Sequence, residues 1–216
     1  MLIIGHKGSN DLVPGNTIEA IKRALEFKVD MIEVDIRVTK DNVAILSHDE
    51  FITSNGLKLK ISDSTYKDLL SSYQELTTLE DALKVSKHTK ILLDIKPGEK
   101  IEPIMRVIAS ILKNQPEKIL IASFDFKLLQ NIHNKYPEIN LAVTERWSGV
   151  RAGHRARNLG TKILIMNQLW LWSGFISSLK GSGYQLYAYT LNNPNKALKW
   201  KKYGLAGVIT DCPDRF

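Results

Sequence analysis

Two stretches of the sequence place acids and a histidine among apolar residues. They are Met31–Val38, which contains Glu33 and Asp35, and Val43–Asp49, which contains His48. In a strand, residues two positions apart point to the same face, so Glu33 and Asp35 form a pair of carboxylates on one face. A carboxylate pair beside an imidazole is the minimum equipment for metal-assisted acid and base chemistry.

The connection between these stretches, Thr39–Asn42, is too short for a crossover between parallel strands. Asp41 and Asn42 tolerate left-handed turn geometry, so the chain is expected to fold back as an antiparallel hairpin. If Asn42 and Val43 close the turn opposite Lys40 and Asp41, the register places Asp35 opposite His48. The hairpin would then bring the imidazole to the carboxylate pair.

Short apolar runs alternate with helical patterns along the whole chain. The runs expected to be barrel strands are Leu2–Gly5, Met31–Val38, Ile91–Ile95, Ile119–Ala122, Leu141–Val143, Ile163–Met166, Gln185–Tyr189 and Ala206–Ile209. Helical patterns between them include Thr17–Phe27, Leu79–Lys87, Ile101–Asn114, Phe126–Lys135 and Asn195–Lys202.

This alternation favours an α/β fold with a parallel sheet. With Val43–His48 counted as the returning arm of the hairpin, eight β/α units remain, and they predict a closed (β/α)8 TIM barrel with a β-hairpin extension after strand 2. An open doubly wound sheet is the alternative, because the pattern does not by itself establish closure. We expect one domain over residues 1–216. Its polar, weakly patterned segment Phe51–Gln74 predicts a small insertion, at about residues 49–77, over the barrel mouth.

In a TIM barrel the working groups lie at the C-terminal ends of the strands. Ionisable residues follow or end several of the predicted strands: His6, Lys7, Glu33, Asp35, His48, Asp94 and Lys96. A single histidine or a single Glu-x-Asp is more often structural, but their coincidence at one end of the barrel indicates an active site.

The three acids Glu33, Asp35 and Asp94 are hard oxygen ligands that suit Mg²⁺ or Ca²⁺, with Mn²⁺ as a further candidate. Zinc is disfavoured because thiol ligands are absent from this set. The ammonium groups of Lys7 and Lys96 are expected at the same rim, where they can neutralise a phosphate. Replacing Lys96 with methionine is therefore predicted to lower kcat/KM and to change stability little.

Aromatic residues near strand ends are further candidates for lining a pocket. Tyr187 and Tyr189, at the end of the seventh predicted strand, are expected to line a pocket, and Tyr189 to contact substrate. The four tryptophans are expected to pack within the protein rather than to bind ligand; they are Trp147, Trp170, Trp172 and Trp200.

The net charge of +7 and the pI near 9.3 favour an anionic partner. The basic residues are scattered and form no recognisable nucleic-acid module, so no nucleic-acid partner is expected. The single cysteine, Cys212, makes no internal disulfide possible, and the chain carries no charged leader and no apolar stretch long enough to span a bilayer. These features predict a soluble cytoplasmic protein, with peripheral membrane contact as an option.

Several short motifs together resemble the glycerophosphodiester phosphodiesterase family. The motifs are His6-Lys7-Gly8, Pro14-Gly15-Asn16-Thr17, Glu33-Val34-Asp35, Thr39-Lys40-Asp41-Asn42, His48-Asp49, Asp94-Ile95-Lys96, Ser123-Phe124, Tyr189-Thr190-Leu191-Asn192 and Gly207–Pro213. The resemblance covers nearly the whole chain. The departures from the family pattern that bear on the site are Lys7 in place of arginine, Gly15 in place of glutamate, and Asp94 in place of glutamate. An aspartate at this third ligand position is also the pattern of the related sphingomyelinase D-type phosphodiesterases.

The resemblance implies a (β/α)8 barrel that hydrolyses glycerophosphodiesters to glycerol 3-phosphate and an alcohol. It implies a divalent cation held by the three acids, with His6 as general base and His48 as general acid, an order that the motifs leave reversible. Two alternatives remain: a phospholipase D-like or cyclising phosphodiesterase acting on lipid head groups, and a barrel that binds phosphodiesters without turnover. The second is disfavoured because both histidines and all three acids are present.

Overall fold

Eight parallel strands close into a barrel in the computed structural model, which describes residues 1–11, 13–54 and 56–216. The strands, in their order around the barrel, are β1 (Leu2–Gly5), β2 (Met31–Val38), β6 (Lys90–Ile95), β7 (Ile119–Ser123), β8 (Asn140–Glu145), β9 (Ile163–Asn167), β10 (Gln185–Tyr189) and β11 (Gly207–Thr210). Strand β1 pairs in parallel with both β2 and β11, so the eight parallel strands form a closed ring. The closed barrel is confirmed, and the open doubly wound sheet is excluded.

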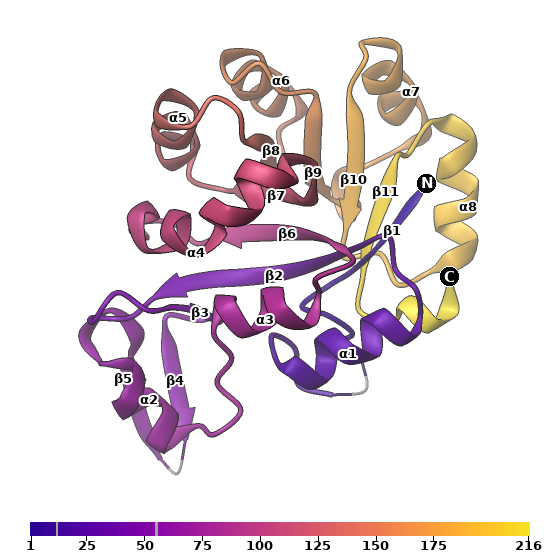
Figure 1. Cartoon of the computed structure of the whole chain (residues 1–216). Helices are drawn as coiled ribbons and strands as arrows, with labels where there is room; N and C mark the ends of the chain where they lie inside the picture. Colours follow the sequence, from indigo (N-terminus) through magenta and orange to yellow (C-terminus); the bar gives the residue numbers. More distant parts are fainter. Residues whose placement is uncertain (12, 55) are drawn as a thin grey trace.

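Helices surround the barrel, as Figure 1 shows. They are α1 (Ile18–Glu26), α3 (Leu79–Val85), α4 (Ile101–Asn114), α5 (Phe126–Lys135), α6 (Gly149–Asn158), α7 (Ser173–Gly181) and α8 (Pro194–Tyr203), with short 3-10 turns η2 (Pro116–Lys118), η3 (Gln168–Trp170) and η4 (Pro213–Arg215). Polar residues define where helices begin: Thr17 caps α1 by accepting a hydrogen bond from the Ala20 amide. The five helices expected from the sequence are present within two residues of their predicted ends.

The side chains of the strands fill two layers. On β2, Ile32, Val34 and Ile36 belong to the cluster between the strands and the helices. The alternate residues Glu33 and Asp35 point to the inside of the barrel, where they reach the candidate site described below. The predicted alternation along this strand is therefore confirmed.

The hairpin after β2 forms, but in a different register from the one predicted. Strand β3 (Ala44–Leu46) pairs with β2 so that Ile36 faces Leu46, and the Ser47 amide donates to the Asp35 carbonyl at 3.1 Å. Asp35 therefore lies opposite Ser47, and the predicted pairing of Asp35 with His48 is wrong. The reason is a three-residue loop, closed by Asn42 in the left-handed region at φ 62°, where four loop residues were expected.

The insertion forms a small lobe beside the barrel (Figure 1). It contains the antiparallel pair β4 (Phe51–Ser54) and β5 (Leu57–Lys60), the turn η1 (Ile61–Asp63) and helix α2 (Tyr66–Ser72), whose first turn carries a capping box between Thr65 and Asp68. Its buried residues, together with one from β3, make their own apolar cluster: Ile45, Ile52, Ile61, Leu69 and Leu76. The lobe borders the mouth of the barrel on the side of β1 and β3, and residue 55 within it lies outside the described residues.

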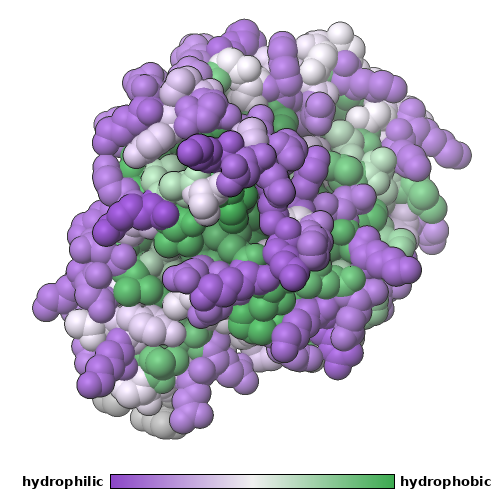
Figure 2. Space-filling model, in the orientation of Figure 1, coloured by the Kyte–Doolittle hydropathy of each residue, from purple (hydrophilic) through white to green (hydrophobic). Residues whose placement is uncertain are grey.

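Charged and polar side chains cover most of the face seen in Figure 2, and apolar side chains show between them near the middle of the view. Within the described ranges, no helix combines the length and the apolar character that crossing a membrane requires.

Candidate active site

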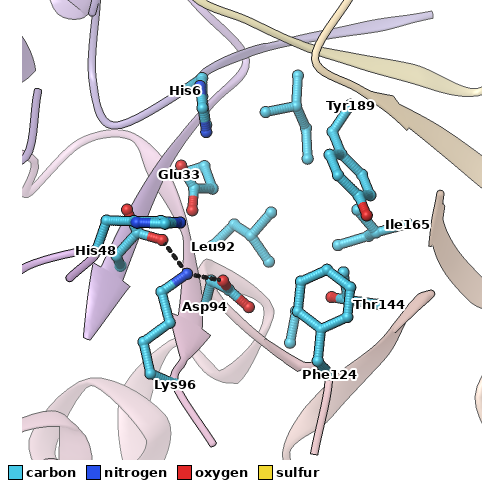
Figure 3. Close-up of a pocket in the computed structure, with 13 residues that line it drawn as sticks. His6, Glu33, His48, Leu92, Asp94, Lys96, Phe124, Thr144, Ile165 and Tyr189 are labelled. Atoms are coloured by element: carbon cyan, nitrogen blue, oxygen red, sulfur yellow. Dashed lines mark hydrogen bonds and ion pairs between the residues drawn. The ribbon is translucent and has the colours of Figure 1, made fainter. Parts of the chain in front are cut away.

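A cavity of about 90 Å³ opens at the C-terminal ends of the barrel strands. Every barrel strand, or the residues just after it, contributes to its walls, which are His6, Glu33, Asp35, His48, Leu92, Asp94, Lys96, Ala122, Phe124, Thr144, Ile165, Tyr189 and Ile209 (Figure 3). Of the nine residues that the sequence predicts for the site or its pocket, seven lie on this cavity. Lys7 lines the adjoining depression next to the insertion, and Tyr187 lies deeper in the barrel.

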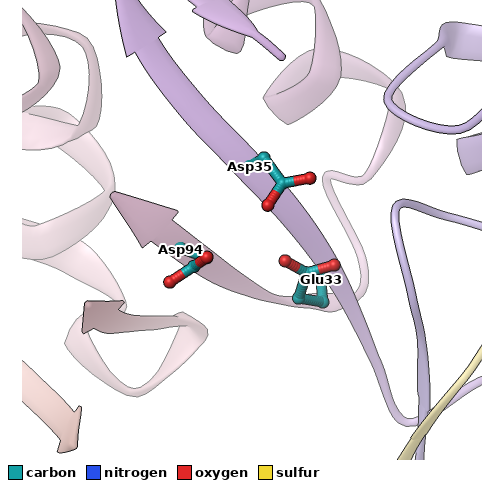
Figure 4. A group of neighbouring side chains, drawn as sticks. All are labelled: Glu33, Asp35 and Asp94. Atoms are coloured by element: carbon teal, nitrogen blue, oxygen red, sulfur yellow. The ribbon is translucent and has the colours of Figure 1, made fainter. Parts of the chain in front are cut away.

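The three acids converge because β2 and β6 are neighbours in register. Asp35 and Asp94 are directly paired across the two strands, and Glu33 lies two residues earlier on the same face (Figure 4). One carboxylate oxygen from each residue lies within 4.8 Å of the others, and all three groups are buried. Burial and the nearby charge of Asp35 raise the pKa of Glu33 to about 7, and burial also raises the pKa of Asp94.

Lys96 is buried among these acids and is not free at the rim. Its ammonium lies 2.6 Å from Asp94 Oδ2 and also contacts the carboxylate of Asp35. Burial would raise the pKa of Asp35, but the charges of Lys96 and Lys7 outweigh it and hold that pKa below its usual range. The site therefore has one strongly acidic carboxyl and two that take up protons more readily.

Backbone geometry near the first strand also serves the carboxylates. Lys7 adopts a left-handed conformation at φ 53°, and its amide donates to Glu33 Oε2 at 2.8 Å. Its ammonium lies 3.8 Å from Asp35 Oδ2. Asn16, at φ 61°, binds Asp35 twice: its side-chain amide donates to Oδ2 at 2.8 Å, and its oxygen accepts from the Asp35 amide at 3.0 Å. Together these contacts fix the orientation of Glu33 and Asp35.

His6 is held by an acid from the other end of the chain. Its Nδ1 lies 2.6 Å from Asp211 Oδ1, and the Asn192 side chain donates to the second oxygen of Asp211 at 2.8 Å. Burial opposes the charged form of Asp211, but the bonds from His6 and Asn192 lower the pKa of this carboxyl to about 2. Burial likewise opposes the charge on His6, yet the bond to Asp211 and the charge of Glu33 raise its pKa overall.

His48 lies on the loop after β3 and is more exposed. Its Nδ1 is 2.8 Å from Asp49 Oδ1, and 56% of its side chain is accessible. The guanidinium of Arg37 donates to the His48 carbonyl from Nε at 3.2 Å and from Nη2 at 3.1 Å, and it binds Glu99 at 3.0 Å. The position of this loop is thus fixed by β2, although the imidazole itself faces the opening.

The opposite wall of the cavity is aromatic and weakly polar. Figure 3 shows Phe124, Thr144 and Tyr189 across the cavity from Lys96 and the acids. Three buried polar atoms on the cavity have no hydrogen-bond partner among the described residues: Asp94 Oδ1, Thr144 Oγ1 and the Tyr189 hydroxyl. Buried polar atoms normally have partners, so this grouping is typical of a site for a polar ligand. Burial raises the pKa of Tyr189 to about 12, which keeps its hydroxyl protonated as a donor.

Two predictions about aromatic residues are wrong in part. Tyr187 lies one layer deeper, in the apolar interior of the barrel, and does not line the cavity. Trp200 is buried as expected, but Trp147, Trp170 and Trp172 are 55%, 51% and 64% exposed. Trp147 follows β8, whereas Trp170 ends η3 and Trp172 follows it after β9. Trp172 stacks on Phe175 of α7 at 5.1 Å and is still more than half exposed.

Comparison with known proteins identifies the family. Residues 6–215 match the model of the glycerophosphoryl diester phosphodiesterase family. The chain belongs to this family. The resemblance read from the motifs is confirmed, and so is the enzyme class that it implies, since the family is one of phosphoric diester hydrolases.

Curated and solved relatives share the full length of the family domain. A glycerophosphodiester phosphodiesterase of Caldanaerobacter subterraneus is 26% identical over 231 residues, which cover 99% of this chain and 95% of that protein. The Bacillus subtilis protein YhdW, which is provisionally named for the same activity, is 29% identical over 99% of this chain and 96% of its own. A phosphodiesterase of Oleispira antarctica, solved with its product sn-glycerol-3-phosphate, is 24% identical and superposes with a TM-score of 0.86 over 100% of this chain and 94% of that one.

The structure explains one departure from the pattern of the glycerophosphoryl diester phosphodiesterases. A Cβ atom at Gly15 would clash with the side-chain oxygen of Asn10 and lie 2.7 Å from Lys7 Cβ. The Asn10 oxygen instead accepts a hydrogen bond from the Gly15 amide at 3.0 Å. A glutamate at this position would need Asn10 to move, so the glycine and Asn10 belong together in this chain.

Three residues that support the site belong to the motifs, but the sequence alone predicts no role for them: Asn16, Asn192 and Asp211. Each acts through a contact between distant parts of the chain: Asn16 with Asp35, and the other two around His6. Their polarity at the ends of β1, β10 and β11 was the available signal, because the barrel brings these ends together.

Proposed function

We propose that the protein hydrolyses glycerophosphodiesters to glycerol 3-phosphate and an alcohol, with Glu33, Asp35 and Asp94 as metal ligands and His6 and His48 as the acid and base pair. The observation that carries this proposal is the single cavity on which all five residues lie, together with Lys96. Membership of the phosphodiesterase family supports the reaction class.

The residues present suit a hard divalent cation, and we favour Mg²⁺ or Ca²⁺ over Mn²⁺. They offer only carboxylate oxygens, which these ions prefer, and Asp94 Oδ1 is buried with no partner among the described residues. Oε2 of Glu33 already accepts from the Lys7 amide, which leaves Oε1 for a ligand role. A bound cation would polarise the phosphoryl oxygens and neutralise charge that develops on them.

The chain's own cations and donors would orient the diester. Lys96 and Lys7 place two ammonium groups next to the carboxylates, where they balance charge and attract an anionic phosphate. The Tyr189 hydroxyl on the opposite wall is a donor without a partner among the described residues and would bind a substrate oxygen. Together they would hold the scissile phosphate between β2 and β10.

The contacts of His6 favour the role of base. Nδ1 donates to the ionised Asp211, which leaves Nε2 as the acceptor directed into the cavity. The more exposed His48 would protonate the departing alkoxide at the opening. The attacking oxygen is either water or the neighbouring hydroxyl of the substrate glycerol; the second route gives a cyclic phosphate that phosphorus NMR would detect.

The deciding experiment measures release of glycerol 3-phosphate from glycerophosphocholine. The purified protein is assayed in EDTA and after addition of Mg²⁺, Mn²⁺ or Ca²⁺. We expect turnover only with a divalent cation. An active enzyme in EDTA would refute the role of the acids as metal ligands, and no turnover with any cation would leave a barrel that only binds phosphodiesters.

One observation favours a second candidate substrate, the head group of an intact lipid. Trp147, Trp170 and Trp172 are exposed at the mouth, and tryptophan is the residue type most suited to a membrane interface. Two results together would establish this alternative. Activity on lysophosphatidylcholine in vesicles would exceed activity on glycerophosphocholine, and it would fall after Trp170→Ala.

A further inference from the structure

A second cavity, of about 350 Å³, opens beside the candidate active site on the side of β7 and β8. It is lined by Phe124, Glu145, Arg146, Trp147, Arg151 and Arg155. Phe124 lines both cavities and packs edge-on against Tyr189, with ring centres 6.2 Å apart. The two cavities therefore share an aromatic wall, and a substrate that extends past Phe124 enters the second one.

The second cavity carries excess positive charge. It has three arginines and one carboxylate, which leaves a net charge of +2. The buried carboxylate of Glu145 accepts from Arg151 Nε and Nη2, both at 2.7 Å, and lies 3.4 Å from Arg155 Nη1. Arg151 is thus neutralised by a two-point ion pair, and this pair fixes the floor of the cavity.

Arg146 and Arg155 supply the charge that remains. Arg146 has no carboxylate partner within 4.0 Å among the described residues, and its guanidinium lies 5.5 Å from the ring centre of Trp147. The charge of Arg146 lowers the pKa of Tyr189, whereas burial raises it. Arg146 therefore lies near the aromatic wall that the two cavities share. Arg155 lies over Phe126 at 5.5 Å, and its one carboxylate contact within the described part of the chain is the long one to Glu145.

Guanidinium groups bind phosphates and carboxylates through two parallel hydrogen bonds, and they stack on aromatic rings while doing so. The arrangement of two such groups beside a tryptophan fits an anion better than it fits a quaternary ammonium or an uncharged sugar. An ammonium head group such as choline would be repelled by the net charge.

We propose that this cavity is a subsite for a second anionic group, carried by the alcohol that is esterified to glycerol 3-phosphate. The inference rests on the proposed function and narrows its substrate class. The favoured substrates are glycerophosphodiesters whose alcohol bears a further phosphodiester. Choline and glycerol esters would then be poorer substrates.

Two compounds isolate the contribution of the second anion. Glycerophosphoglycerol and 1,3-bis(glycerophospho)glycerol share the same central alcohol and differ by one phosphodiester. Calorimetric titration of each into the protein in EDTA gives the ratio of their Kd values, and release of glycerol 3-phosphate with a divalent cation gives the ratio of kcat/KM. We expect 1,3-bis(glycerophospho)glycerol, the bis-diester, to be favoured by roughly 10- to 100-fold in Kd and in kcat/KM. This is the effect of one or two charge-assisted hydrogen bonds.

The variant Arg146→Gln with Arg155→Gln should reduce this preference to about twofold, the statistical factor for two equivalent scissile bonds. The matched control is Arg157→Gln, an exposed arginine on the same helix as Arg155 that does not line the cavity. It should keep the wild-type preference. Arg146→Gln alone, at a surface position, provides a second variant if the double variant folds poorly.

The outcomes separate the two proposals. Equal Kd values for the two compounds in the wild type, or a preference that survives the double variant, would overturn the subsite. Hydrolysis of glycerophosphoglycerol alongside equal Kd values would retain the proposed function and reject only the subsite. Tighter binding of the bis-diester without hydrolysis of either compound would support the subsite and reject the proposed function.

Discussion

Replacing Lys96 with methionine removes a buried cation from between two carboxylates, and the structure predicts a large loss of stability. At 2.6 Å from Asp94 Oδ2, a unit charge pair is worth roughly 6 kcal/mol at an effective dielectric constant of 20, before desolvation is subtracted. Methionine keeps the length of the side chain but leaves Asp35 and Asp94 facing each other without compensation.

Loss of one partner of a buried ion pair costs about 3–5 kcal/mol of unfolding free energy. We expect the lower end of this range at pH 7, because burial has already raised the pKa of Asp94 and protonation of this acid relieves part of the repulsion. This corrects the expectation from sequence alone, which placed Lys96 at the rim and predicted little change in stability. We still expect kcat/KM to fall on the order of 100-fold or more, as for the loss of one preorganised electrostatic contact.

The assay measures the unfolding free energy of the wild type and of Lys96→Met by urea titration in EDTA, with circular dichroism as the signal. Lys100→Met is the matched control, because Lys100 is exposed and, among the described residues, its side chain makes a hydrogen bond to Asn42 and no ion pair; its effect should stay within about 0.5 kcal/mol. Added Mg²⁺ should stabilise Lys96→Met more than the wild type, since a cation then replaces the lost charge. A Lys96→Met protein whose unfolding free energy in EDTA matches that of the control would refute this reasoning.

Three further predictions concern the proposed acids and histidines. Glu33→Ala with Asp35→Ala should abolish the heat of divalent-cation binding in calorimetry, because three converging carboxylates are the proposed ligands; unchanged binding would place the cation elsewhere. His48→Ala should slow hydrolysis of glycerophosphocholine perhaps 10²–10⁴-fold but slow a p-nitrophenyl ester much less, since p-nitrophenol leaves without protonation, whereas His6→Ala should slow both alike; the reverse pattern would exchange their roles. Because the pKa of Asp211 is lowered to about 2, the stability that its ionised carboxylate contributes is present above the ordinary aspartate pKa near 3.9 and is lost as the pH falls toward 2. The difference in unfolding free energy between the wild type and Asp211→Asn, measured in urea, should therefore shrink over that range. A constant difference from pH 5 to pH 2 would contradict the assigned shift.

The strands of the barrel could be predicted because each is a short run of large apolar residues, buried on both faces. Helix α6 lacks large apolar residues: its buried face consists of Ala152, Gly153 and Ala156, so the sequence shows no apolar stripe there although the helix packs on the barrel. The hairpin register was wrong by one residue because a left-handed Asn42 shortens the loop, a choice that the sequence permits but does not impose.

The residues of the site could be predicted because barrel geometry assigns chemistry to the C-terminal ends of strands. Their partners could not, since those contacts join positions far apart in the chain. The burial of Lys96 depends on the pairing of Asp35 with Asp94, and the support of His6 depends on Asp211. The first contact requires β2 and β6 to pair, and the second requires the barrel to close between β1 and β11.

The bond between His6 and Asp211 joins two residues 205 positions apart, across the seam where β1 meets β11. During synthesis the acids of β2 and β6 leave the ribosome well before β11, and the partner of His6 directly follows β11. A chain that stops before β11 would carry the carboxylates and both histidines without the acid that orients the first of them. Closure of the seam between β1 and β11 and assembly of the proposed acid and base pair are therefore one event, and activity would report that this seam has formed.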